Sequence, residues 1–225
     1  MSEPVAPAAD AGFQYGDRLH ENETALSGMW LFLATEVMLF GALFLGYTVY
    51  RHMHYEPFMH ASNHLYVSLG TTNTVVLLTS SLMMALAVHA AREGDSKWIV
   101  RYLLLTIALG LVFLGIKFTE YYLDYRERLI PHSRWWEPHS ADARFDREMQ
   151  LFFVFYFIMT MLHAIHMVVG MSMLAMLAWF AHRRRFTATY NTPVDMLGLY
   201  WHFVDIVWVF LFPTLYLINP AARGH

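Results

Sequence analysis

Five long apolar stretches, separated by short polar links, limit what this chain can fold into more than any other feature. Each is long enough to cross a bilayer, since a helix rises about 1.5 Å per residue and the hydrocarbon core is about 30 Å thick. They cover, approximately, residues 27–50, 66–91, 98–123, 148–181 and 196–218. The sequence therefore predicts an all-α integral membrane protein, a bundle of five transmembrane helices. We expect one domain over residues 27–220, with a polar tail at residues 1–26 and a short tail at residues 221–225.

Composition agrees with this class and excludes others. The 225 residues are 57% hydrophobic and 15% charged, and a formal net charge of −3 gives no indication of a nucleic-acid partner. The chain has no cysteine, which excludes a disulfide framework, a thiolate-held iron–sulfur cluster and a copper centre with Cys ligands. The polar tail lacks a basic region followed by an apolar core, so we do not expect a cleaved signal peptide.

Basic residues in the short links favour one orientation in the membrane. Arg92, Lys97 and Arg101 surround the second link, and residues 183–185 are three consecutive arginines in the fourth. Because basic residues of short links collect on the cytoplasmic side, we expect the N-terminus in the cytoplasm and the C-terminus outside.

Polar side chains inside the predicted spans are the candidates for a functional site. A charged group at the centre of a membrane helix costs about 2.5–3.5 kcal/mol, so such groups usually face a protein interior. The first span contains Glu36, the fourth contains His163 and His166, and the last contains His202 and Asp205. The i, i+3 spacing places each pair on one helical face, and a rise of about 1.5 Å per residue places all five groups in the same half of the bilayer. We therefore expect a buried polar cluster.

Each member of this predicted cluster has more than one interpretation. Glu36 is either a protonated acid that joins helices by hydrogen bonding or a group that exchanges protons. Imidazoles such as His163 and His166 are common ligands of metals and haem, but a closed site needs more donors than this sequence offers, so we expect no metal site. His202 and Asp205 fit structural hydrogen bonds between helices.

Lys117 and Glu120 form another i, i+3 pair, in the third span near the opposite interface. We expect an interfacial ion pair that reaches water, with the lysine extended toward the surface. On this interpretation the pair belongs to the end of a helix and not to the core of the bundle.

Four stretches of the chain form a recognisable set: residues 28–40, 72–81, 160–170 and 200–212, the last containing the run Tyr-Trp-His-Phe-Val-Asp. Together they resemble subunit III of the haem-copper oxidases, in particular the short five-helix bacterial form of cytochrome c oxidase subunit 3. The resemblance carries the intramembrane glutamate of the family over to Glu36, and its paired histidines over to His163 and His166. The chain departs from the family at Lys117, where glutamine is usual. It also lacks the two extra N-terminal helices of larger members, which border a lipid-filled cleft.

This resemblance implies an accessory subunit, without a catalytic site or redox centre, in an oxygen-reducing, proton-translocating oxidase. Haem and copper are then expected in partner subunits. The subunit packs against catalytic subunit I, stabilises it during turnover and supports proton uptake. Other oxidase subunits, a respiratory supercomplex, membrane lipids and a bound phospholipid are the further implied partners. The location implied is a bacterial inner membrane, with the C-terminus in the periplasm.

Three alternatives remain open on the sequence. The related subunit of a quinol oxidase or of nitric oxide reductase has an overlapping pattern. A stand-alone membrane metalloenzyme would use the His163–His166 pair as ligands. A proton or solute transporter would show inverted repeats and broken helices, and the sequence shows neither.

Overall fold

The computed structural model describes residues 9–131, 142–183 and 192–218, and for residues 9–23 and 25 it describes only the backbone. Within these ranges the chain is entirely helical in its regular structure. The helices are α1 (Ala9–Met53), α2 (Tyr55–Ser62), α3 (Val67–Glu93), α4 (Ser96–Arg126), α5 (Ala143–His182) and α6 (Thr192–Tyr216). Five of them are long and apolar enough to cross a membrane: α1 from Leu26 onward, α3, α4, α5 and α6. The predicted class, a helical protein with five membrane spans, is confirmed.

The first helix begins earlier than the sequence indicated. We placed its start at residue 27, whereas α1 begins at Ala9. The last proline before the apolar stretch is Pro7, so nothing in the polar segment that follows interrupts a helix. The apolar part of α1 starts at Leu26, close to the predicted position. Residues 1–8, which are part of the predicted N-terminal tail, and residues 219–225, which include the predicted C-terminal tail, lie outside the described residues.

A short helix, α2, occupies the first link, which we expected to be irregular. Pro57 lies in its first turn, where a missing N–H leaves no helical hydrogen bond unmade. Phe58 is fully buried, and its ring meets that of Phe152 on α5 edge-on, with 5.6 Å between centroids. Burial of this aromatic side chain explains why the link folds back onto the bundle.

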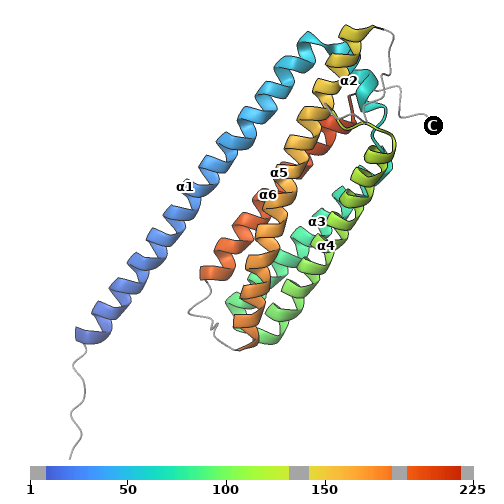
Figure 1. Cartoon of the computed structure of the whole chain (residues 1–225). Coiled ribbons are helices and arrows are strands. Elements are labelled where there is room, and N and C mark those ends of the chain that lie inside the picture. The colour runs from blue at the N-terminus through green and yellow to red at the C-terminus, as the bar shows by residue number, and fades with distance from the viewer. Residues whose placement is uncertain (1–8, 132–141, 184–191, 219–225) are drawn as a thin grey trace, which may run out of the picture. The chain divides into compact units, whose positions relative to one another are not determined.

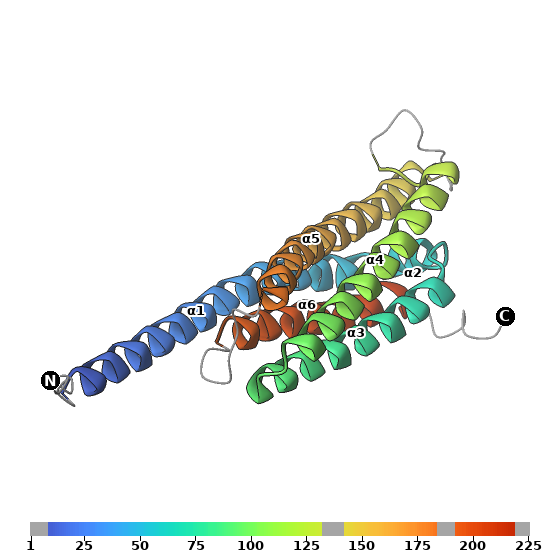
Figure 2. The ribbon, with the colours of Figure 1, turned by 90° about the horizontal axis from the view of Figure 1, so that it is seen from below.

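The chain divides into two compact units, Met1–Met38 and Leu39–His225. The first consists of most of α1. In the second, α3 packs against α4 and α6, and α5 packs against the same two helices, so the four helices form a closed ring. Figures 1 and 2 show α3 to α6 running side by side in two perpendicular views. Only Gly94 and Asp95 separate α3 from α4, so these two neighbours are antiparallel.

Local sequence determines where these helices start and stop. Gly94 follows α3 in the left-handed conformation (φ 76°), which glycine adopts without a steric penalty. The carboxylate of Asp95 then accepts a hydrogen bond from the backbone N–H of Lys97 (3.0 Å) and caps α4. Asp142 caps α5 in the same way, through the N–H of Arg144 (2.8 Å).

Two buried tryptophans of α6 fix its contact with α3. The indole of Trp201 donates to the hydroxyl of Ser80 (3.1 Å), and that of Trp208 donates to the hydroxyl of Thr74 (3.2 Å). Buried Trp N–H groups need such acceptors. Ser80 and Thr74 of α3 therefore serve as hydrogen-bond partners for the two large aromatic residues of α6.

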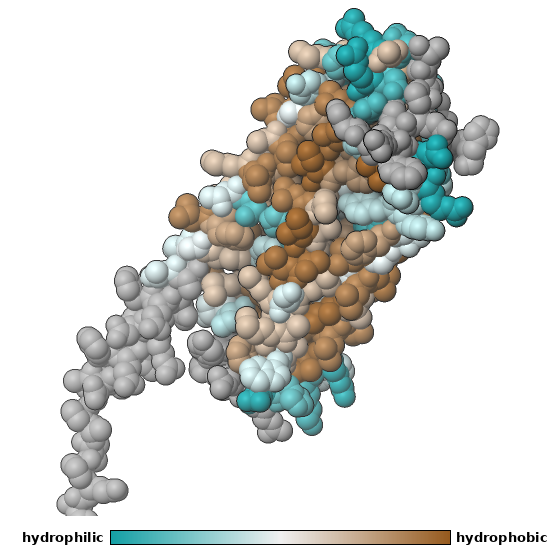
Figure 3. Space-filling model, in the orientation of Figure 1, coloured by the Kyte–Doolittle hydropathy of each residue, from teal (hydrophilic) through white to brown (hydrophobic). Residues whose placement is uncertain are grey.

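The outer surface of the bundle is apolar, as expected for contact with lipid. Figure 3 shows hydrophobic colour along the helices and hydrophilic colour at the ends. Many large apolar side chains are exposed on it, including Leu104, Leu111, Ile165 and Phe210. Because lipid tails and the protein interior are equally apolar, hydropathy alone does not separate the inner from the outer face of these helices.

Candidate functional site

His163 lies in the centre of the bundle. Its side chain on α5 is 1% exposed and packs between the rings of Phe113 on α4 and Trp208 on α6, with centroids 5.5 and 5.3 Å away. Neither ring nitrogen has a hydrogen-bond partner among the described residues. The imidazole is thus held by aromatic packing.

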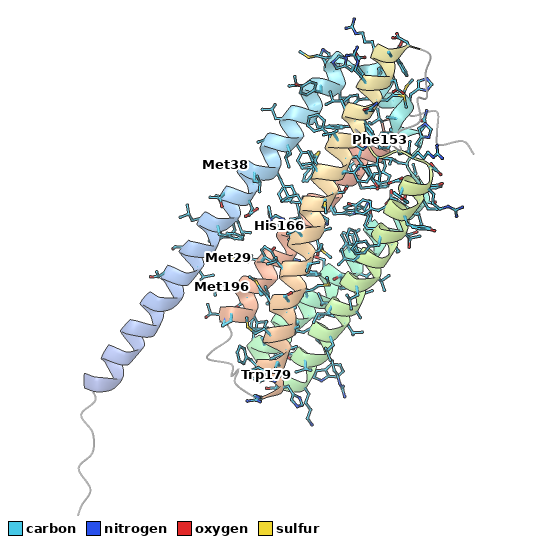
Figure 4. All side chains as sticks on the ribbon, in the orientation of Figure 1. Met29, Met38, Phe153, His166, Trp179 and Met196 are labelled. Atoms are coloured by element: carbon cyan, nitrogen blue, oxygen red, sulfur yellow. The ribbon has the colours of Figure 1, made fainter. Side chains whose placement is uncertain are left out.

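His166, one turn further along α5, has different neighbours. It is labelled about midway along the helix in Figure 4. Its Nδ1 lies 2.8 Å from the backbone oxygen of Leu162, and its ring meets that of Phe40 edge-on at 5.2 Å. The two histidines lie on adjoining parts of α5, as their spacing predicts, but they contact different side chains.

His202 and Asp205 lie on the side of α6 that faces α3. Nδ1 of His202 is 2.7 Å from the hydroxyl of Ser81. Asp205 is 3% exposed, and neither carboxylate oxygen has a well-formed hydrogen bond within the described chain, although Ser81 is nearby. Ser81 on α3 is therefore the polar side chain around which this pair is arranged.

The predicted cluster of five groups remains a prediction. No hydrogen bond joins any two of His163, His166, His202 and Asp205 in the unit Leu39–His225. Glu36 is half-buried on the part of α1 that forms the other unit. Within the described ranges, no three His, Asp or Glu side chains converge on a position that a metal ion could occupy.

A second set of polar groups is more compact than the one we predicted. It consists of the side chains of Lys117, Glu120, Asp124, Tyr156 and Tyr216, here called the Lys117 group. All five are 3% exposed or less, and they come from α4, α5 and α6.

Hydrogen bonds connect four members of the Lys117 group. The ammonium group of Lys117 donates to Glu120 (2.8 Å), to the hydroxyl of Tyr216 (2.8 Å) and to that of Tyr156 (3.3 Å). Tyr216 in turn donates to the other oxygen of Glu120 (2.5 Å). The ammonium group also lies 5.1–5.5 Å from the ring centroids of Tyr121, Tyr156, Trp208 and Tyr216. A buried ion pair needs such additional partners to offset the cost of removing both charges from water.

Asp124 completes the group on the same face of α4, one turn after Glu120. It is fully buried, and neither of its oxygens has a well-formed hydrogen bond among the described residues, although the hydroxyl of Tyr156 lies close to it. The group therefore contains two carboxyl groups and one amine. With the lysine protonated, it is electrically neutral when the carboxyl groups hold one proton between them.

The expected exposure of Lys117 and Glu120 was wrong. The two side chains pair as predicted, but they are 3% and 0% exposed and point into the bundle, not toward water. The physical reason is tertiary: Tyr156 and Tyr216, distant in sequence, bring hydroxyls to the pair. A partial signal was present, because Lys117, Glu120 and Asp124 follow the helical period of the buried positions Gly110 and Phe113.

At the same end of α4 as the Lys117 group, a half-buried tyrosine joins two links. The hydroxyl of Tyr66 donates to Glu127 at 2.6 Å. This bond, followed by partial desolvation and the charges of Glu127 and Asp124, raises the pKa of Tyr66 above its usual value. The contact closes the end of the bundle at which α3 begins and α4 ends.

These features define a class: a multi-pass helical membrane protein with a polar core and five candidate spans. The chain matches the family Cytochrome c oxidase subunit III over residues 10–125 and 139–219. It is 29% identical over 205 residues to cytochrome c oxidase subunit 3 of Thermostichus vulcanus, covering 90% of this chain and 92% of the relative. It is 28% identical over 208 residues to the probable quinol oxidase subunit 3 of Staphylococcus aureus strain USA300, covering 92% and 95%.

The chain belongs to the cytochrome c oxidase subunit III family. It is subunit III of a haem-copper terminal oxidase, and as such it associates with other subunits of the oxidase complex. Subunits of this family typically lack redox centres of their own. The expected family is thus confirmed. In the structure, His163 and His166 lie on α5, Glu36 on α1 and the run from Tyr200 on α6.

Proposed function

We propose that this chain is the accessory subunit III of a proton-translocating terminal oxidase in a bacterial inner membrane, where it packs against catalytic subunit I. The match to the family over nearly the whole chain is the observation that carries this proposal. Haem and copper are held by partner subunits, and this chain supports proton uptake and the stability of the catalytic subunit. Its N-terminus lies in the cytoplasm and its C-terminus in the periplasm.

The proposal also concerns the electron donor of the oxidase complex. We infer a cytochrome c oxidase, and the similar identity to a quinol oxidase subunit makes quinol the second candidate. The test is affinity purification of the tagged chain from native membranes, followed by an optical spectrum. Haem bands are expected in the purified material, and their absence would contradict the assignment to an oxidase complex. Oxygen consumption with reduced cytochrome c, compared with a quinol, then identifies the donor.

Glu36 is the side chain that we propose to influence proton uptake. It is a half-buried acid in the apolar stretch of α1, and the resemblance to the family supports this proposal because it matches the intramembrane glutamate of the family to this residue. In the whole complex, Glu36→Gln is expected to slow proton uptake and to shorten the number of turnovers before inactivation. Glu93→Gln, at an exposed end of α3, is the matched control and is expected to have no effect. Unchanged kinetics in Glu36→Gln would leave Glu36 with a packing role only.

A further inference from the structure

The Lys117 group contains more acid than base and is buried. Its five side chains are 3% exposed or less, and two carboxyl groups accompany one ammonium group. If both acids are ionised, one negative charge has no cation to offset it, which is costly inside a membrane protein. We therefore expect the group to bind one proton, which either Glu120 or Asp124 holds.

Hydrogen bonds favour Asp124 as the position of this proton. Glu120 accepts from Lys117 (2.8 Å) and from Tyr216 (2.5 Å), and donors to a carboxylate stabilise its charged form. Neither oxygen of Asp124 has a well-formed hydrogen bond within the described ranges. The hydroxyl of Tyr156 lies close to Asp124 and accepts from Lys117 (3.3 Å), so it connects the acid to the ammonium group. In the neutral group, Glu120 is thus the carboxylate and Asp124 the protonated acid.

Asp124 is also the charged member of the group closest to the end of α4. The helix ends at Arg126, so Asp124 lies about 3 Å from that end along the axis, whereas Lys117 lies about 13 Å from it. Glu127 follows the helix and is exposed. It is three residues from Asp124, a spacing at which side chains on a helix are neighbours, with about 5–6 Å between Cβ atoms. An exposed acid therefore lies one turn from the buried one.

Besides the members of the group, the titratable side chains that face Asp124 within the described residues are Tyr66, Tyr121 and Glu127. The two phenol groups are engaged in other contacts. Tyr121 donates to the hydroxyl of Thr160 (2.8 Å). Tyr66, which precedes α3, donates to Glu127 (2.6 Å) and holds its carboxylate at this end of the bundle. Glu127 is therefore the acid positioned to exchange a proton with Asp124.

We propose that Asp124 is a proton-exchange site, which takes up and releases a proton through Glu127 at the end of α4 while Lys117 keeps Glu120 ionised. On release, the O–H bond of Asp124 breaks, the proton passes to the carboxylate of Glu127 and then to water, and the Lys117 group changes from neutral to one negative charge. The charge of Lys117 stabilises the released state, because it attracts both buried carboxylates.

This site is distinct from Glu36, which lies on α1. In the orientation proposed above, the end of α4 faces the periplasm. That choice of compartment rests on the proposed function, whereas the exchange itself does not and is measured on the chain alone.

The test is infrared spectroscopy of the purified full-length chain in detergent micelles as a function of pH. The C=O stretch of a protonated carboxyl group is separate from the bands of ionised carboxylates. We expect a band that disappears reversibly as the pH rises and that Asp124→Asn removes. Asp205→Asn, which removes another carboxyl group that is 3% exposed, is the matched control and is expected to leave this band and its pH response unchanged. Labelling with ¹³C-aspartate shifts the band in the wild type, so its assignment to aspartate over Glu120 holds even if Asp124→Asn does not fold.

The rate of exchange tests the route. After a pH jump from a photolysed caged proton, Glu127→Gln is expected to slow the change of the Asp124 band about a hundredfold, the order of magnitude for a positioned proton-transfer group. Glu56→Gln removes an exposed acid of α2 at the same end of the bundle (Figure 1) and is expected to leave the rate unchanged.

Three results would overturn the proposal. A band of Asp124 that persists at every pH at which the chain stays folded would mean a permanently protonated, structural acid. The absence of any aspartate band besides that of Asp205 would mean an acid that is always ionised. An equal rate in Glu127→Gln and the wild type would exclude exchange through Glu127.

Discussion

The energetic coupling between Lys117 and Glu120 is the most direct test of the Lys117 group. The two side chains are 3% and 0% exposed and 2.8 Å apart. In Lys117→Met, Glu120 keeps a hydrogen bond from Tyr216 but lies beside Asp124 without a cation. In Glu120→Gln, the ammonium group loses its counter-charge. Removing one partner of a buried pair costs about 3–5 kcal/mol, because the other charge stays buried and uncompensated.

The double variant Lys117→Met/Glu120→Gln removes both charges together. It is therefore expected to cost about 2–3 kcal/mol less than the sum of the single variants, and this difference is the coupling energy. The free energy of unfolding is measured on the full-length chain in mixed micelles, with a denaturing detergent and tryptophan fluorescence as the signal. All four members of the cycle are compared under the same conditions.

An exposed pair supplies the matched control. Arg92 and Asp195 are 3.2 Å apart, but their side chains are 65% and 27% exposed. Their cycle, with Arg92→Met and Asp195→Asn, is expected to give a coupling of about 0.2–1 kcal/mol. A buried-pair coupling no larger than this value would refute the reasoning, because burial would then add nothing to the interaction.

Two further predictions concern packing and pH. A Cβ at Gly170 would lie 3.1 Å from the buried ring of Trp201, so Gly170→Ala is expected to destabilise the chain by about 1–3 kcal/mol in the same unfolding assay. Gly115 has open space around it, so Gly115→Ala is the control and is expected to be neutral or stabilising. The pKa of Tyr66 is raised in the folded chain, so its bond to Glu127 stabilises the fold fully below a pH of about 10. This stabilising contribution is lost as the pH rises through the pKa that Tyr66 has in the folded chain. Tyr66→Phe is expected to flatten that alkaline part of the thermal-stability profile, and an unchanged profile would contradict the assignment.

The five spans could be predicted because hydropathy and length alone decide whether a segment crosses a membrane. The predicted stretch 66–91, for example, is α3 at Val67–Glu93. Helix α2 could not be predicted in the same way, since Tyr55–Ser62 is too short for a periodic signal. Its structure depends on burial of Phe58 against α5, a contact that the local sequence does not specify.

The candidate site was harder to predict, for a reason specific to membranes. In a soluble helix the apolar face marks the core, but a membrane helix is apolar on both its inner and outer faces, so polar residues alone indicate direction. This logic correctly turned His163 and Asp205 inward. The same reasoning gave the wrong result for Lys117. A lysine near the end of a membrane helix is expected to extend its side chain to water, and the sequence does not show the buried partners that keep it inside the bundle.

Those partners also explain how the bundle accommodates a buried lysine at position 117. A glutamine at this position could donate to Glu120 and a tyrosine hydroxyl without adding charge. A lysine adds a buried cation, which the rings of Tyr156, Tyr216 and Trp208 and the carboxyl groups of Glu120 and Asp124 surround. Lys117→Gln is thus expected to keep the hydrogen bonds and to lose only the charge. The free energy of unfolding of this variant is then expected to increase when Asp124 is also replaced by asparagine. If Asp124→Asn rescues nothing in that background, the two carboxyl groups do not share the charge of Lys117.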